Sequence, residues 1–139
     1  MKCPYNVSSP ASVIGMRALS PPGLAVMRHN INELVEQRNY LVAMLEKIKG
    51  ARKESFPGVG RIIGGLDANF VLVQIVNGNG EPDNDIAENL YSTLAEEMGV
   101  VVRFRGNEMG CVGSLRVTVG TKVELQTLVQ CLQDWQSSF

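Results

Sequence analysis

The chain has 139 residues, of which 45% are hydrophobic and 19% charged, enough for one domain with an ordinary core rather than a disordered segment. Thirteen Lys and Arg against fourteen Asp and Glu give a net charge of −1, which argues against a nucleic-acid partner because nucleic-acid-binding surfaces are normally basic. No apolar run approaches the roughly 20 residues of a membrane-spanning helix, so we expect a soluble protein with no membrane partner.

The three cysteines, Cys3, Cys111 and Cys131, are far apart and form no Cys-x-x-Cys motif. With His29 as the only histidine, neither a disulfide framework nor a zinc site is indicated. The N-terminus resembles neither a secretory signal nor an Arg-rich transit peptide. We therefore expect reduced thiols, no bound metal and a cytoplasmic location.

The first fifty residues predict two helices. Pro4 and Pro10 favour an extended start, because proline lacks the N–H group that a helix interior needs. A helix is then predicted from about Ala11 to Leu19, where Ser20-Pro21-Pro22-Gly23 ends it. Apolar residues recur at three- and four-residue steps beyond this point, which predicts a long amphipathic helix from about Leu24 to Lys49.

The next segment holds Pro57 and glycines at positions 58, 60, 64 and 65. These glycines match no phosphate-binding loop pattern and open no helix, so they predict a turn or a flexible loop. The run Phe70–Val76 that follows is β-branched and apolar on both faces, which predicts a central strand covered on both sides. A turn at Asn77–Gly80 leads to a helix that starts near Pro82.

Gly99 is predicted to end the helix that starts near Pro82. Two strands follow, at Val100–Arg103 and at about Ser114–Val119. A last helix then begins with a capping box formed by Thr121 and Glu124. The apolar residues that this last helix should bury are Leu125, Leu128, Val129, Leu132 and Trp135. The predicted fold class is therefore α/β, with a few-stranded sheet and helices packed mainly on one face.

Arginines are the strongest candidates for binding chemistry. Arg103, Arg105 and Arg116 lie on or beside two consecutive strands joined by a glycine-rich connection. If Arg103 and Arg116 converge on one face of a hairpin, their planar guanidinium groups would form a clamp for an anion. Surface arginines paired with local carboxylates would show the same spacing, so the sequence pattern leaves both interpretations open.

Four segments together resemble the C-terminal third of the histidinol-phosphate aminotransferases. They are, in order, Lys2–Pro10, Asp67–Phe70, Gly99–Arg103 and Gly113–Thr121. The resemblance covers nearly the whole chain. It implies the C-terminal small domain of a fold-type I pyridoxal-phosphate enzyme with the aspartate-aminotransferase fold, working as a homodimer. Residues 1–22 would be an interdomain arm with a short helix, and residues 23–139 the small domain.

The resemblance also implies roles for single residues. The family's arginine that matches Arg116 holds the α-carboxylate of the amino donor, and the one that matches Arg103 helps to hold the other anionic end of the substrate, here a phosphate. Tyr5 and Asn6 would lie near the substrate mouth and are predicted to bind substrate. The implied reaction converts imidazole acetol phosphate and glutamate to histidinol phosphate and 2-oxoglutarate, a step of histidine biosynthesis.

In that family the lysine that forms a Schiff base with the cofactor, and the aspartate that pairs with its pyridine nitrogen, lie upstream of the Pro-Tyr-Asn segment. None of the lysines here matches that stretch. We therefore expect no catalytic or cofactor-binding residue in this chain and no transamination by the chain alone, with pyridoxal phosphate bound mainly by the large domain. The apolar surface for that domain, including Pro4–Leu19, should make an isolated chain associate with itself or a neighbour.

Two other interpretations stay open. Another enzyme of the same fold, such as a phosphothreonine decarboxylase or a broad aromatic or branched-chain aminotransferase, would share both arginines in outline. Its substrate profile would separate it, because a histidinol-phosphate enzyme should lose activity when the phosphoester is removed. A non-catalytic α/β module that binds amino acids at an interface would instead change its association on binding ligand and would need no cofactor.

Overall fold

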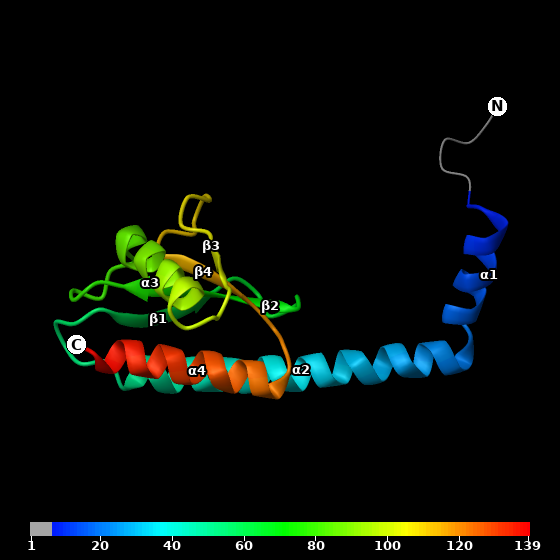
Figure 1. Cartoon of the computed structure of the whole chain (residues 1–139), viewed down its shortest axis with the longest axis horizontal. Coiled ribbons are helices and arrows are strands. Elements are labelled where there is room, and N and C mark those ends of the chain that lie inside the picture. Colours follow the sequence, from blue (N-terminus) through cyan, green and yellow to red (C-terminus); the bar gives the residue numbers. More distant parts are fainter. Residues whose placement is uncertain (1–6) are drawn as a thin grey trace, which may run out of the picture. The chain divides into compact units, whose positions relative to one another are not determined.

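The computed structural model describes residues 7–139 (Figure 1). The chain divides into two compact units, residues 1–33 and residues 34–139. The first unit contains α1 (Ser9–Ala18) and the first turns of α2 (Pro21–Gly50), and the second contains the last turns of α2 with the whole sheet. Among the helices of residues 7–139, none is long and apolar enough to cross a membrane.

The junction between α1 and α2 is built by residues that suit helix ends. Ser8 caps α1, because its side chain accepts a hydrogen bond from the Ala11 N–H. Pro21 and Pro22, predicted only to end the first helix, also begin the second, because proline has the right φ angle for a first turn and needs no hydrogen-bond acceptor there. A side chain at Gly23 would overlap the Ala18 carbonyl oxygen, so this tight connection requires glycine.

The second unit is organised around a four-stranded sheet with the order β1-β2-β4-β3. Its strands are β1 (Gly58–Ile63), β2 (Phe70–Val76), β3 (Arg103–Phe104) and β4 (Ser114–Thr118). Each neighbouring pair is antiparallel. β2 lies between β1 and β4, which confirms the prediction that this apolar run is a central strand.

The two faces of the sheet differ in burial. Alternate residues of β2 and β4 are at most 3% exposed: Val71, Val73, Ile75, Leu115 and Val117. They share one core with Leu41 and Leu45 of α2, with Leu90 of α3 (Asn84–Glu96) and with Leu125 of α4 (Lys122–Ser137). On the opposite face Phe70, Leu72 and Arg116 are only half-buried. The helices therefore pack mainly on one face, as predicted, and we call the other face the open face.

The prediction that β2 is covered on both sides holds only for its C-terminal half. Gln74 and Val76 are buried, whereas Phe70 and Leu72 on the same face are half-buried. Because Phe70 and Leu72 are apolar, the sequence predicted that both faces of the strand are buried. The alternation of side chains shows which residues share a face, but it does not show whether another element covers that face.

The glycine-rich segment predicted as a loop contains β1, so that prediction was wrong. A Cβ atom at Gly60 would lie 2.7 Å from Val76 Cγ1, and one at Gly58 would lie 2.5 Å from Gln136 Oε1. Glycine is therefore required by close packing of this edge strand and not by a turn. The register shifts between Val59 and Ile62, which marks a β-bulge.

The strand predicted at Val100–Arg103 was also largely wrong, because the pairing begins only at Arg103. The preceding valines form an irregular connection from α3 instead. Val100 donates its N–H to the Leu94 carbonyl at 2.7 Å, and Val102 is buried in the core. Three valines in a row favour a strand by propensity, but this backbone closes the end of a helix.

The start of α4 agrees with the prediction from the sequence. Thr121 Oγ1 accepts from the Glu124 N–H, and Glu124 Oε2 accepts from the Thr121 N–H at 2.7 Å, which confirms the capping box. The hydrogen bond from the Thr121 backbone lowers the pKa of the Glu124 carboxyl. The five apolar residues predicted to be buried along α4 are buried, and Gln136 is buried with them.

Gln136 of α4 links α2 and β1 through hydrogen bonds, so replacing it should lower the stability of the second unit. Its Nε2 donates to the Ile48 carbonyl at 2.8 Å, and its Oε1 accepts from the Val59 N–H at 2.9 Å. Gln136→Ala should lower the free energy of unfolding by about 1–3 kcal/mol, because the buried Val59 N–H loses its acceptor, whereas the Ile48 carbonyl still accepts from the Ala51 N–H. Urea denaturation measures this, with Gln133→Ala as the control on the same helix. Equal losses in the two variants would contradict the role of Gln136.

Candidate functional site

The register of the sheet places Arg103 directly opposite Arg116, on β3 and β4. Directly opposed residues of antiparallel strands share a face, with their Cβ atoms about 4.5–5.5 Å apart. Leu72 of β2 is the partner of Arg116 on its other side, so both guanidinium groups extend from the open face. The two arginines therefore share one face of the hairpin, as their spacing suggested.

Arg116 is held against an aromatic ring. Its Cζ atom lies 5.5 Å from the centroid of the Phe70 ring, a distance at which the positive charge is attracted to the ring. Its Nε atom is buried and has no hydrogen-bond partner among residues 7–139. A buried donor without a partner costs free energy, and the terminal nitrogens of the same guanidinium are the donors that an anion could contact.

The arginines of this hairpin differ in their pairing. Arg105 Nη1 lies 2.7 Å from Glu108 Oε1, so for Arg105 the interpretation as an ion-paired surface residue is correct. Neither Arg103 nor Arg116 forms an ion pair in the part of the chain that the structure describes. Arg103 is exposed and Arg116 half-buried. Two adjacent cations without local carboxylates repel each other, and an anion between them would relieve that repulsion.

The connection between the two arginine-bearing strands is fixed by Asn84 at the start of α3. Its Nδ2 donates to the Gly106 carbonyl at 3.2 Å, and its Oδ1 accepts from the Gly113 N–H at 2.7 Å. The Gly113 carbonyl in turn accepts from the Ile75 N–H of β2 at 2.7 Å. Sequence reasoning missed Asn84, because no local pattern shows that a helix start will contact a loop 22 and 29 residues further on.

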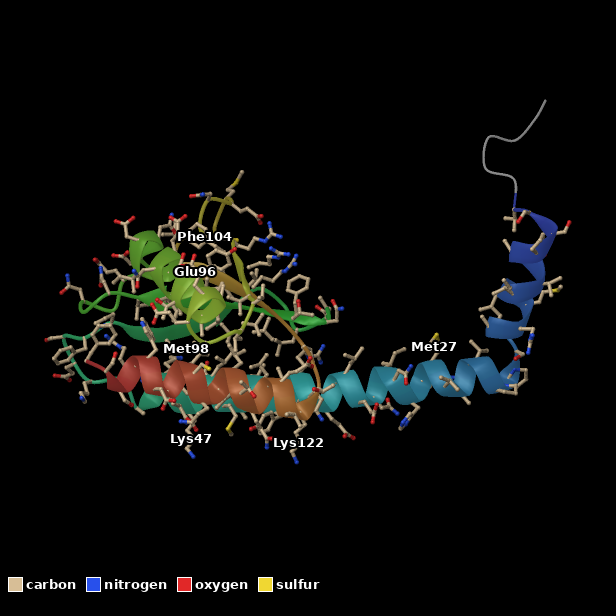
Figure 2. All side chains as sticks on the ribbon, in the orientation of Figure 1. Met27, Lys47, Glu96, Met98, Phe104 and Lys122 are labelled. Atoms are coloured by element: carbon tan, nitrogen blue, oxygen red, sulfur yellow. The ribbon has the colours of Figure 1, made fainter. Side chains whose placement is uncertain are left out.

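Tyr5 and Asn6, predicted to bind substrate, lie outside the described residues. The described part of the first unit exposes apolar side chains, and α1 has no buried residue. The exposed residues of α1 and the first turns of α2 include Val13, Ile14, Met16, Val26 and Met27, the last of which is labelled in Figure 2. Isolated exposed apolar residues are ordinary, but a whole helix without a buried side chain indicates a surface that packs against another part of a protein.

No cluster of three metal-ligating His, Cys, Asp or Glu side chains occurs within residues 7–139. Of the described lysines, Lys47, Lys49, Lys53 and Lys122 are all exposed. Lys49 Nζ lies 2.9 Å from Glu46 Oε2, and Figure 2 shows Lys47 and Lys122 on the side of the helices away from the sheet. The open face presents Arg103 and Arg116, which form no ion pair within residues 7–139 and whose guanidinium groups suit the geometry of an anion.

Comparison with known proteins shows which family this chain resembles. Residues 1–132 match the family model described as aminotransferase class I and II. Histidinol-phosphate aminotransferases of Candida maltosa and Schizosaccharomyces pombe are each 42% identical to this chain, over 94% and 97% of its length and 31% and 35% of theirs. The enzyme of that name from Saccharomyces cerevisiae is 40% identical over 96% of this chain and 32% of its own. The chain thus spans about a third of the length of these relatives.

A solved structure shows the same fold. A decarboxylase from Sulfurospirillum multivorans superposes with a TM-score of 0.74 at 17% identity, over 98% of this chain and 31% of that one. At this identity the likeness concerns the fold alone.

Proposed function

The chain belongs to the aminotransferase class I and II family, and on that premise we propose that it is the C-terminal part of a histidinol-phosphate aminotransferase and supplies that enzyme's substrate-anion site. The reaction would transfer an amino group between glutamate and imidazole acetol phosphate in histidine biosynthesis. The observation that supports this most is the opposed pair Arg103 and Arg116, free of carboxylate partners within residues 7–139, in a chain 40–42% identical to enzymes of that name.

Each arginine has a distinct role in this proposal. Arg116, positioned by the Phe70 ring, holds the α-carboxylate of glutamate, because a planar guanidinium group matches the two oxygens of a carboxylate. Arg103 is exposed and reaches the phosphate at the other end of the phosphorylated substrate. Tyr5 and Asn6 are proposed to contact substrate at the mouth of the same site. Closure of the site against water would strengthen each of these contacts.

The family depends on pyridoxal phosphate, which supplies an electron sink for the carbon that bears the amino group. The described residues do not fit that group. Every lysine among residues 7–139 is exposed, and no aspartate lines the two cavities that Lys47, Lys49 and Lys53 border. We propose that the large domain of the enzyme binds the cofactor and that this chain contributes substrate recognition only, so that it is inactive when isolated.

The exposed apolar residues of the first unit support a proposal about partners. We propose that Pro4–Leu19 and the first turns of α2 pack against the large domain of the same enzyme, in a cytoplasmic homodimer. The non-catalytic amino-acid-binding module is not favoured, because the relatives that match nearly the whole chain are named as enzymes.

A chimaeric enzyme tests the proposal. In it, this chain replaces the matching C-terminal third of the Schizosaccharomyces pombe relative, whose upstream part supplies the large domain. We expect the chimaera to transfer the amino group of histidinol phosphate to 2-oxoglutarate, and to lose about 100-fold or more in kcat/KM when histidinol replaces histidinol phosphate. The unmodified parent enzyme is the control.

Three results would contradict the proposal. A chimaera that binds the cofactor and shows a native melting transition but transfers no amino group would exclude this chain as the missing third. Equal kcat/KM for histidinol and histidinol phosphate would indicate a broad aminotransferase. Release of CO₂ from phosphothreonine without amino transfer would indicate a decarboxylase.

A further inference from the structure

A second concave site lies in the second unit, at the end of the sheet where β2 finishes. It is a cavity of about 360 Å³, and its lining includes the basic residues Lys49, Arg52 and Arg61 together with Gln74, Gly60 and Gly80. No carboxylate lines it. We call it the basic cavity. It is separate from the arginine pair, because neither Arg103 nor Arg116 is among its lining residues.

Arg61 is held toward the cavity by a chain of hydrogen bonds. Its Nε atom donates to Gln74 Oε1 at 2.9 Å, and Gln74 Nε2 donates to the Val112 carbonyl at 3.1 Å. Gln74 is only 4% exposed, so its amide is fixed by the sheet. Because this arrangement uses only Nε, the two terminal nitrogens of Arg61 keep their donors for a ligand.

Arg52 forms a second wall of the cavity. Its Nη1 donates to the Phe56 carbonyl at 2.9 Å and to the Asn77 carbonyl at 3.4 Å. These acceptors are neutral, so the guanidinium keeps its full charge. A Cβ atom at Gly80 would lie 3.4 Å from Arg52 Nη2, and Gly80 has a φ angle of +84°. Glycine there leaves the space beside Nη2 open.

Charge balance points to a doubly negative ligand. Lys49 is paired with Glu46 at 2.9 Å, which offsets its charge, whereas Arg52 and Arg61 have no ion-pair partner among the residues that the structure describes. Two unneutralised guanidinium groups match the charge and the hydrogen-bond acceptors of a phosphate dianion. The apolar Val76 and Pro82 also line the cavity, and they leave room for a small carbon skeleton.

We infer that the basic cavity binds a small phosphate dianion, free or as a monoester, at Arg52 and Arg61. This site is independent of the proposed substrate site, because it uses different residues and needs no large domain in its lining. It would act as a second anion site, through which phosphate concentration stabilises the folded chain.

The test is a titration of the ¹⁵N-labelled full chain with inorganic phosphate, followed by NMR. We expect the amide signals of Gly60 and Gly80 and the side-chain amide of Gln74 to shift together along one saturable curve. Arg61→Gln should weaken this binding by about tenfold or more, the effect of losing one charge-assisted contact. Lys47→Gln is the matched control, because it removes one positive charge from the last turns of α2, outside the cavity, and it should change affinity less than threefold.

A double variant of the proposed substrate site tests whether the basic cavity binds phosphate independently of that site. With Arg103→Gln and Arg116→Gln together, the shifts at Gly60 and Gly80 should persist with unchanged affinity, whatever happens to substrate recognition. A parallel titration with glycerol 3-phosphate distinguishes the sources: tighter binding than phosphate indicates a monoester, and equal or weaker binding indicates the free ion.

Three outcomes would overturn the inference. These are absence of shifts in the cavity at saturating phosphate, equal affinity in Arg61→Gln and wild type, or equal weakening by Lys47→Gln and Arg61→Gln. The NMR spectrum of each variant reports its folding directly. If Arg61→Gln fails to fold, Arg61→Lys replaces it. This variant keeps the charge but loses the Nε donor to Gln74 and the planar pair of terminal nitrogens, and it should still weaken binding measurably.

Discussion

Replacing Arg116 with glutamine in the chimaeric enzyme should lower kcat/KM for glutamate by about 10²–10³-fold, because it removes one partner of a charge-assisted contact in a closed site. The structure supplies the reason. The Arg116 guanidinium is fixed over the Phe70 ring, its Nε lacks a partner among residues 7–139, and no described carboxylate neutralises it. Steady-state kinetics with varied glutamate measures the loss.

Two further variants control this result. Arg116→Lys keeps the charge but loses the planar pair of donors, so it should recover only part of the activity. Arg105→Gln removes an arginine of the same hairpin that is already neutralised by Glu108, and it should change kcat/KM less than about threefold. An Arg105→Gln loss as large as that of Arg116→Gln would show that general positive charge is sufficient and the proposed clamp is not needed.

Replacing Gly113 with alanine should destabilise the chain by about 3 kcal/mol or more, a loss that arises from a side chain forced against fixed backbone. Gly113 has a φ angle of +68°, and a Cβ atom there would lie 2.7 Å from both the Asp83 nitrogen and the Ile75 oxygen. Both neighbours are backbone atoms of the sheet and of the start of α3, so neither moves easily. Thermal denaturation should show a fall in Tm of about 10 °C or more.

Gly110 provides the matched control for Gly113. Its φ angle is +77°, but nothing lies within 4 Å of a Cβ atom placed there. Gly110→Ala should therefore cost only the backbone strain, about 1 kcal/mol. Equal losses for the two alanine variants would show that the close approach at Gly113 is not what fixes the start of β4.

Much of the fold follows from local sequence patterns. The long helix, the central strand Phe70–Val76 and the capping box of Thr121 and Glu124 were each predicted near their observed bounds. All three depend on residues close together in sequence. The edge strand β1 was missed because its glycines are required by contacts with Val76 and Gln136, and such distant contacts leave no local pattern.

The candidate site was likewise only partly predictable from local sequence. The spacing of Arg103 and Arg116 pointed to a shared face, but only the register showed them directly opposed. Local sequence gave no means to separate these arginines from Arg105, since the pairing of Arg105 with Glu108 depends on how the connection folds. Asn84 and Gln74, which position the loop and Arg61, act through contacts across the fold. Tertiary packing therefore decides which arginines are available to bind an anion.

The most direct test of the account is the ratio of kcat/KM for histidinol phosphate to kcat/KM for histidinol, measured in the chimaera with and without Arg103→Gln. If Arg103 holds the phosphate, this ratio should fall by about 30-fold or more in the variant, because only the phosphorylated substrate loses a contact. A ratio that stays the same while both activities fall equally would show that Arg103 does not recognise the phosphate and would contradict the anion clamp.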